Sequence, residues 1–338
     1  RTGDDYWFRH ELIKDFIFND TTSLSRKELA QGILSLLRQK YPDEIRLGKT
    51  IPKALPVYAS LLSYSDNQEE CYNVNLELGN RYYSVGEYLP ALDYFKKCLE
   101  SSKDLRNTGT TLNNIGLVFH RQGKYPEALN YFQKALGIRR EVGDRPGEGS
   151  ILNNIGLVCH RQGKYPEALD YLQKALGIRR EVGDRPEEGT TLNNIGLVYH
   201  RQGKYTEALD HFQKVLSIRK EVKDRPGEGC TLNNIGMVYD TQDKHHEALD
   251  YYQNALGIHR EVGDRSGEGG TFNNIGLVYH KQGLFPKALD YYQKALRISQ
   301  ELGDRPGEGG TLNNIGLIYY RLGKHINALD YYQKALGI

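Results

Sequence analysis

The sequence has no long hydrophobic run and no large excess of charge of either sign. None of its apolar stretches approaches the roughly 18 consecutive apolar residues that a membrane-spanning helix needs, so an integral membrane protein is excluded. Its 45 lysines and arginines nearly balance its 43 aspartates and glutamates, leaving a formal net charge of +2. A dedicated nucleic-acid-binding domain is usually strongly basic. We therefore expect neither a membrane nor a nucleic acid as partner.

Cysteine and methionine are also scarce. The four cysteines lie far apart and form no CxxC pair, so neither a disulfide nor a zinc framework is expected. A reducing, cytoplasmic setting is the simplest interpretation. Methionine occurs once, at Met237, the chain opens with Arg1, and it stops at Ile338 inside a running pattern. We therefore expect this chain to be a piece of a longer protein.

What the sequence has in abundance is repetition. The segment Leu-Asn-Asn-Ile-Gly, or a close variant, recurs every 40 residues, and residues 111–150 match residues 151–190 at 34 of 40 positions. A weaker copy, three residues shorter, precedes them near Gly79. A fixed period of this kind is typical of repeat architectures. We predict an array of seven repeats over residues 69–338, the last one incomplete.

Each repeat is predicted to form two helices. Leu112, Ile115 and Phe119 have the i, i+3, i+7 spacing of one helical face. Gly123 follows where the end of a helix favours glycine, and Pro126 is placed to open the second helix. No segment shows sustained alternation of polar and apolar residues, so strands are not expected. The predicted fold is all-α.

The linker between repeats carries its own helix signals. Gly143 is placed to end one helix, Asp144 to cap the next, and Pro146 to begin it. A single short helix pair cannot bury its own apolar face, so stacked neighbours must complete the core. The small residues Gly116 and Ala128 are expected where the two helices of a repeat cross.

The order and spacing of Gly116, Phe119, Ala128, Phe132 and Ala135 resemble the tetratricopeptide-repeat pattern. The Leu-Asn-Asn-Ile-Gly and Ala-Leu-Asp-Tyr-Tyr-Gln-Lys-Ala-Leu segments look like kinesin light chain repeats. The linker Glu-Val-Gly-Asp-Arg-Pro-Gly-Glu-Gly looks like the long repeats of LGN/Pins spindle-orientation adaptors. A leucine replaces the aromatic residue common near the start of the first helix, and the period exceeds the common 34. The resemblance implies a right-handed superhelical solenoid whose first helices line a concave groove.

The first 68 residues break the period and are predicted to form a separate helical segment. Residues 6–18 fit a short amphipathic helix, and a capping box beginning at Ser25 opens a second helix. This layout is similar to the stretch after the winged-helix region of STAND signalling ATPases, which resemble NACHT and NB-ARC proteins. The alternative is a helical cap over the exposed end of the solenoid, which such arrays require.

The candidate binding positions lie on the first helix of each repeat, where residues do not face the core. By resemblance to kinesin light chain and O-GlcNAc transferase repeats, the second asparagine of each repeat belongs to a ladder in the groove. An amide is both donor and acceptor, so a ladder would bind the backbone of an extended peptide. The alternative is that the asparagines bond neighbouring repeats, and the two roles are compatible. The column comprises Asn114, Asn154, Asn194, Asn234, Asn274 and Asn314.

The next column carries basic residues. It would make one wall of the groove mildly basic and favour an acidic protein or peptide segment, unless nearby acidic side chains balance it. Asp240 interrupts the wall in the fifth repeat, and Leu76 and Glu77 replace the asparagines in the first, so the ladder should not reach that repeat. The predicted peptide-binding residues of this column are His120, Arg121, His160, Arg161, His200 and Arg201.

No catalytic or metal site is predicted. Equivalent histidines come from different repeats, and helices packed about 10 Å apart cannot all bring a nitrogen within about 2 Å of one metal ion. Near-identical repeats also argue against an active site, which needs several different groups to converge once. We therefore expect no enzyme, no cofactor and no catalytic residue.

These patterns favour a protein-interaction scaffold or sensor module that binds an extended peptide segment, within a larger cytoplasmic signalling protein. The alternative is an autoinhibitory array that restrains a STAND ATPase or a protease-type effector, again without catalytic residues in this chain. A third hypothesis is self-association, in which an uncapped solenoid end at Ile338 stacks on another copy.

Overall fold

The computed structural model of the chain describes residues 56, 59, 63 and 67–338. The expected N-terminal segment of residues 1–68, with its amphipathic helix and capping box, lies almost wholly outside the described residues. From residue 67 onward the backbone consists of helices joined by short turns, without a strand. The all-α prediction is confirmed over this part of the chain.

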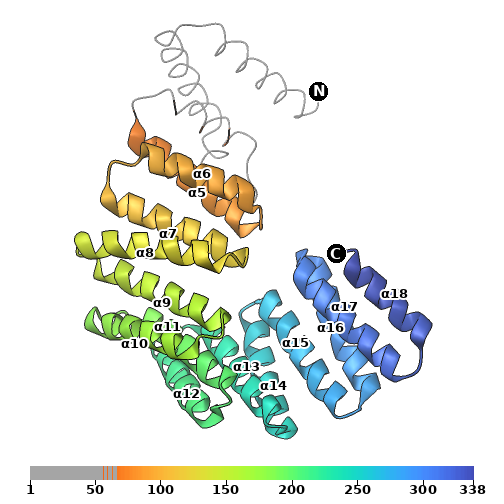
Figure 1. Cartoon of the computed structure of the whole chain (residues 1–338). Coiled ribbons are helices and arrows are strands. Elements are labelled where there is room, and N and C mark those ends of the chain that lie inside the picture. The colour runs from red at the N-terminus through yellow and green to blue at the C-terminus, as the bar shows by residue number, and fades with distance from the viewer. Residues whose placement is uncertain (1–55, 57–58, 60–62, 64–66) are drawn as a thin grey trace, which may run out of the picture. The chain divides into compact units, whose positions relative to one another are not determined.

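Fourteen helices have bounds between residues 67 and 338, and they alternate as the first and second members of seven pairs (Figure 1). The first helices are α5 (Gln68–Ser84), α7 (Leu105–Arg121), α9 (Arg145–Arg161), α11 (Arg185–Arg201), α13 (Arg225–Thr241), α15 (Arg265–Lys281) and α17 (Arg305–Arg321). The second helices are α6 (Tyr88–Ser101), α8 (Tyr125–Glu141), α10 (Tyr165–Glu181), α12 (Tyr205–Glu221), α14 (His245–Glu261), α16 (Phe285–Leu302) and α18 (His325–Leu336). None of these helices combines the length and the apolar character needed to cross a bilayer.

The described helices fall into two compact bodies, an N-terminal body with α5 to α9 and a C-terminal body with α10 to α18. Within each body, a second helix packs on its own first helix and on the first helix of the next repeat, as α14 does with α13 and α15. First helices also touch one another, α5 with α7 and α7 with α9 in one body, α13 with α15 and α15 with α17 in the other. This is the packing of a helix-turn-helix array.

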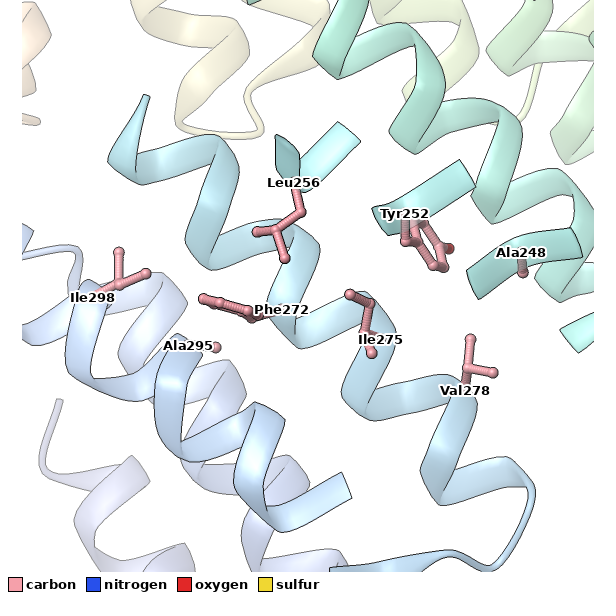
Figure 2. Close-up of a cluster of buried hydrophobic side chains, with 8 residues drawn as sticks. All are labelled: Ala248, Tyr252, Leu256, Phe272, Ile275, Val278, Ala295 and Ile298. Atoms are coloured by element: carbon pink, nitrogen blue, oxygen red, sulfur yellow. The ribbon is translucent and has the colours of Figure 1, made fainter. Parts of the chain in front are cut away.

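The core is shared between neighbouring repeats. Figure 2 shows Tyr252 and Leu256 of α14 facing Phe272 and Ile275 of α15, with Ile298 of α16 completing the cluster. All these side chains are at least nine-tenths buried. Because the cluster takes residues from two repeats, a repeat in isolation would expose part of it to water. This confirms that stacked neighbours complete the core.

The two helices of a repeat approach closely at a glycine. A Cβ on Gly116 would lie 2.6 Å from Cε1 of Phe132, and Ala128 on the second helix is fully buried. In the C-terminal body, a Cβ on Gly236 would lie 2.7 Å from Cε1 of Tyr252. The predicted crossing of small residues is therefore confirmed, and an aromatic ring fills the space that the missing side chain leaves.

The predicted turn signals are also found in the structure. Gly143 has a φ of 65°, and Asp144 caps α9 by accepting a hydrogen bond from the Gly147 N–H at 2.9 Å. Lys223 occupies the position equivalent to Gly143 and adopts a φ of 57°. This left-handed conformation costs a residue with a Cβ about 1 kcal/mol or more, whereas glycine adopts it without steric cost.

A buried glutamate stabilises the junction between consecutive repeats. We call this junction, where the end of a second helix meets the start of the next first helix, the joint. Glu148, in the first turn of α9, accepts hydrogen bonds from Arg140 at 2.8 Å and from Arg145 at 2.6 Å, and its side chain is 8% exposed. Burial raises the pKa of this carboxyl, but the two guanidinium groups together outweigh burial and hold its pKa below the ordinary 4.5. In the C-terminal body, Glu188 and Glu268 are held in the same way.

Replacing Lys223 with glycine should stabilise the protein. We expect Lys223→Gly to raise the free energy of unfolding by about 0.5–1 kcal/mol, because relief of the strained φ exceeds the added entropy of a glycine in the unfolded chain. Urea denaturation followed by circular dichroism measures the change. The matched variant Gly183→Lys, at the same turn of the third repeat, should be destabilised. Equal urea midpoints for all three proteins would contradict a strained φ at Lys223.

The Glu148 joint predicts a loss of stability in acid. Because folding lowers the pKa of this carboxyl, its contribution is complete above pH 4.5 and is lost as the pH falls through the lowered value. Glu148→Gln should therefore cost about 1 kcal/mol at pH 7, and the difference from the unsubstituted protein should shrink below pH 4.5. Urea midpoints measured across this pH range test it. The exposed neighbour Glu141→Gln is the control and should change little.

Candidate functional site

Within each body, the asparagine column runs along the first helices and joins neighbouring ones. In the C-terminal body, Nδ2 of Asn234 donates to Oδ1 of Asn193 at 2.8 Å, and Nδ2 of Asn314 donates to Oδ1 of Asn273 at 3.0 Å. In the N-terminal body, Nδ2 of Asn154 donates to Oδ1 of Asn113 at 2.9 Å. The second asparagine of one repeat thus binds the first asparagine of the repeat before it. The predicted bonding between neighbouring repeats is present.

The column also reaches the first repeat, which the sequence analysis excluded. Asn114 donates from Nδ2 to Oδ1 of Asn80 in α5 at 3.1 Å. Asn80 lies one helical turn beyond Leu76, on the same side of α5. The prediction that the ladder stops before this repeat was wrong, because an asparagine at a different sequence position supplies the acceptor.

These bonds use only part of each amide. Asn154, Asn234, Asn274 and Asn314 each donate one N–H, and their side-chain oxygens accept no hydrogen bond from the described residues. All four side chains are half-buried, while Asn194 is 8% exposed. The column therefore keeps accessible acceptors at a regular interval while its amide nitrogens hold neighbouring helices together.

The histidines beside this column lie against aromatic rings. The His120 ring is 6.0 Å from the Tyr125 ring, and the His200 ring is 5.8 Å from the Tyr205 ring. Burial, together with the positive charge of Arg201, lowers the pKa of His200 below 6.5. Burial also lowers the pKa of His120. These histidines are therefore mostly neutral at pH 7, and the positive charge of the wall comes from its arginines.

Some basic side chains of the wall are already paired. Nζ of Lys281 lies 2.8 Å from Oδ2 of the buried Asp240, and Arg121 donates to the Tyr83 hydroxyl at 3.2 Å. Arg201 is exposed and makes no hydrogen bond or ion pair with any residue that the structure describes. The predicted interruption at Asp240 is thus a local ion pair, and Arg201 is a free positive charge beside the asparagine column.

A further column was missed by the sequence analysis. Arg139, at the end of α8, donates to Oδ2 of Asp144 at 2.7 Å and to Oγ1 of Thr110 in α7 at 2.7 Å. We call this set of three positions the arginine clamp. Arg139 and Asp144 are close in sequence, but Thr110 lies 29 residues before the arginine, and each member belongs to a different element. Only comparison of all three columns across the repeats would have connected them.

In the fifth repeat, the three clamp positions carry side chains that are close enough together to bind one metal ion, the one such group found among the described residues. Here Cys230 replaces the threonine, His259 replaces the arginine, and Asp264 retains the aspartate. The ligand atoms of these three residues lie within 4.8 Å of one another. His259 is buried, with Nδ1 2.9 Å from Oδ2 of Asp264. This histidine–aspartate pair takes the place of the arginine–aspartate pair, so the cluster has a structural explanation without a metal.

Comparison with known proteins agrees with this architecture. A family model described as tetratricopeptide repeat matches residues 107–181, 187–261 and 268–338. No curated protein sequence matches the chain.

Several solved structures share the fold. A Rap protein complexed with competence and sporulation factor has a TM-score of 0.64 at 15% identity, covering 98% of this chain and 92% of that one. The Rap conjugation gene regulator of plasmid pLS20, in complex with the Phr* peptide, has a TM-score of 0.62 at 16% identity, covering 98% and 92%. A STAND protein with a tetratricopeptide repeat sensor from Pyrococcus horikoshii has a TM-score of 0.61 at 17% identity, covering 98% of this chain and 52% of that one. At these identities the likeness concerns the fold alone.

The histidine environment gives a test by NMR. His200 should titrate below pH 6.5, and Arg201→Gln should raise its midpoint because a nearby positive charge is removed. Arg321→Gln should raise the midpoint of His280 instead, since Arg321 is the charge that acts on that ring. A midpoint of His200 at or above 6.5, or equal responses to both variants, would show that the assigned environments are wrong.

Proposed function

Because the chain belongs to the tetratricopeptide-repeat family, we propose that it is a protein-interaction module that binds an extended peptide segment along its first helices. The asparagine column, with the residues beside it, is the binding surface in this proposal. The chain recognises its partner and carries out no chemistry of its own.

The regular row of open side-chain oxygens is the observation that carries the proposal. Asn234, Asn274 and Asn314 present the same acceptor from three successive first helices. Their positions are held by bonds between repeats, so little side-chain entropy is lost when a ligand binds. An extended peptide offers backbone N–H groups at regular intervals. Such a surface binds the peptide through its backbone and tolerates many different side chains on it.

Charge narrows the choice of ligand. Arg201 adds an unpaired positive charge beside this surface, and Arg161 is exposed at the equivalent position of the preceding repeat. The neutral histidines add none at pH 7. Complementary potential therefore favours an acidic segment, mainly through the association rate and specificity.

The fold is used for peptide binding in a similar structure. The Rap regulator of plasmid pLS20 is in complex with the Phr* peptide, and the Pyrococcus horikoshii protein carries its repeats as the sensor of a STAND ATPase. These likenesses support a peptide ligand and a place within a larger, cytoplasmic signalling protein. They also favour the alternative in which the array restrains the rest of its own protein until a partner binds.

A capture experiment tests the proposal. The chain would be compared with Arg201→Glu and with the triple variant Asn194→Ala, Asn234→Ala, Asn274→Ala, using lysate from the source cells and mass spectrometry. We expect the specific partner to be lost, by about tenfold or more, from both variants. Arg201→Glu is the sharper of the two because Arg201 makes no bond within the described residues.

A charge-matched control separates the surface from general electrostatics. Lys214→Glu makes the same charge change at an exposed residue of the second helix α12 and should retain the partner. Circular dichroism must show unchanged helicity in every variant. Equal recovery by all variants would overturn the proposed surface, whereas no specific partner for any of them would favour the intramolecular, autoinhibitory role.

A further inference from the structure

The arginine clamp is complete in one repeat of the C-terminal body. Arg219, at the end of α12, donates to Oδ2 of Asp224 at 2.5 Å and to Oγ1 of Thr190 in α11 at 3.0 Å. Its side chain also lies against two glycines of neighbouring first helices, Gly189 and Gly227. The guanidinium thus fills the space between the first halves of α11 and α13.

Two repeats later, the clamp has lost two of its three groups. Ser299 of α16 stands at the position that Arg139 and Arg219 occupy in the second and fourth repeats, and Gly270 of α15 stands at the position of Thr110 and Thr190. Asp304, the acidic member, is retained. The arginine is therefore missing while the carboxylate that binds it elsewhere is still present.

A pocket occupies this place in the structure. It has a volume of about 390 Å³ and lies between α15, α16 and α17, within the usual range of about 300–1,000 Å³ for small-molecule sites. Ser299 and Gly270 line it, so the pocket lies where an arginine and a threonine meet in the complete clamp of the fourth repeat. Its other polar lining residues are Ser266, Asn273, Asp304, Thr311 and Asn314.

The carboxylate of Asp304 is oriented by a backbone hydrogen bond and is available to a cation. Oδ1 accepts a hydrogen bond from the Gly307 N–H at 3.1 Å, and no basic side chain pairs with Asp304 within the part of the chain that the structure describes. Asp304 is exposed, whereas Asp144 and Asp224 are half-buried beneath their arginines. A planar guanidinium, with its several N–H donors, suits a carboxylate better than a lysine ammonium does.

We propose that this pocket binds a guanidinium group, carried by an arginine side chain of the ligand. The inference rests on the proposed function, because Asn273 and Asn314 of the asparagine surface also line the pocket. A peptide that follows this surface passes the pocket and inserts an arginine where the array lacks its own. The ligand is then an acidic segment with an arginine near the end that meets α15 and α17.

Binding of a single amino-acid derivative tests the pocket without any partner. The full chain would be titrated with N-acetyl-arginine amide and with N-acetyl-citrulline amide, a neutral analogue of nearly the same shape, by NMR or calorimetry. The arginine compound should bind about tenfold more tightly than the citrulline compound. Equal affinities, or shifts that do not map to α15, α16 and α17, would overturn the proposal.

Substitutions distinguish the pocket from other acidic sites. Ser299→Arg restores the arginine–aspartate pair of the clamp, so it should abolish binding and raise the melting temperature, which also shows that the variant folds. Asp304→Asn should weaken binding of the arginine compound to the level of the citrulline compound. Arg219→Ser opens the equivalent space beside Asp224 and should create a second site. Unchanged binding by Ser299→Arg would contradict the proposal.

The two proposals fail separately. The titration uses no protein partner, so a negative result removes the arginine pocket and leaves the capture experiment to decide about the asparagine surface. Conversely, the titration could show arginine binding while the asparagine variants still capture their partner normally. That combination would support the arginine pocket and overturn the proposed asparagine surface.

Discussion

The buried glutamate at the joint between repeats is the interaction on which the array depends. Glu188 binds Arg180 of α10 and Arg185 of α11, and Arg185 continues to Glu221 at the end of α12 at 2.6 Å. One joint thus spans two repeats. A buried ion pair adds little net stability, because desolvation offsets much of the attraction. We interpret the joint as fixing the angle at which the next helix pair meets the shared core.

The proposed binding surface follows from that fixed angle. When consecutive first helices meet at the same angle, equivalent asparagines come within hydrogen-bonding distance, as Asn234 and Asn193 do. The same regularity places open oxygens and charged side chains in rows. A surface built by repetition suits a ligand that is itself repetitive, and an extended backbone has that property. In the proposal, departures from the repeat, such as Ser299, supply side-chain specificity.

Much of the fold was predictable because each element carries its own signal. Asp144 caps its helix, Gly143 ends the one before, and Gly116 marks the crossing with Phe132, as the sequence pattern predicted. The candidate site was less predictable. The sequence showed which positions avoid the core. It did not show which asparagine of a pair donates the hydrogen bond, nor that Asn114 bonds to Asn80. Those facts depend on how helices from different repeats pack, and local periodicity does not encode that.

The arginine clamp shows the same limit. Arg139, Asp144 and Thr110 belong to three elements, and their contact depends on tertiary packing. The sequence did contain a weak signal, since arginine changes to His259 and then to Ser299 along one column. Only the interatomic distances show that this column is part of a set of contacts. Near-identical repeats helped here, because the complete clamps show what the incomplete one lacks.

Hydrogen exchange with the captured partner bound is the most direct test of the central claim, that first helices form the binding surface. Amide exchange would be measured by mass spectrometry on the chain alone and in the complex. The account predicts slower exchange in α11, α13 and α15, with α12 and α14 little changed. Protection confined to the second helices, or to the residues before α5, would contradict it.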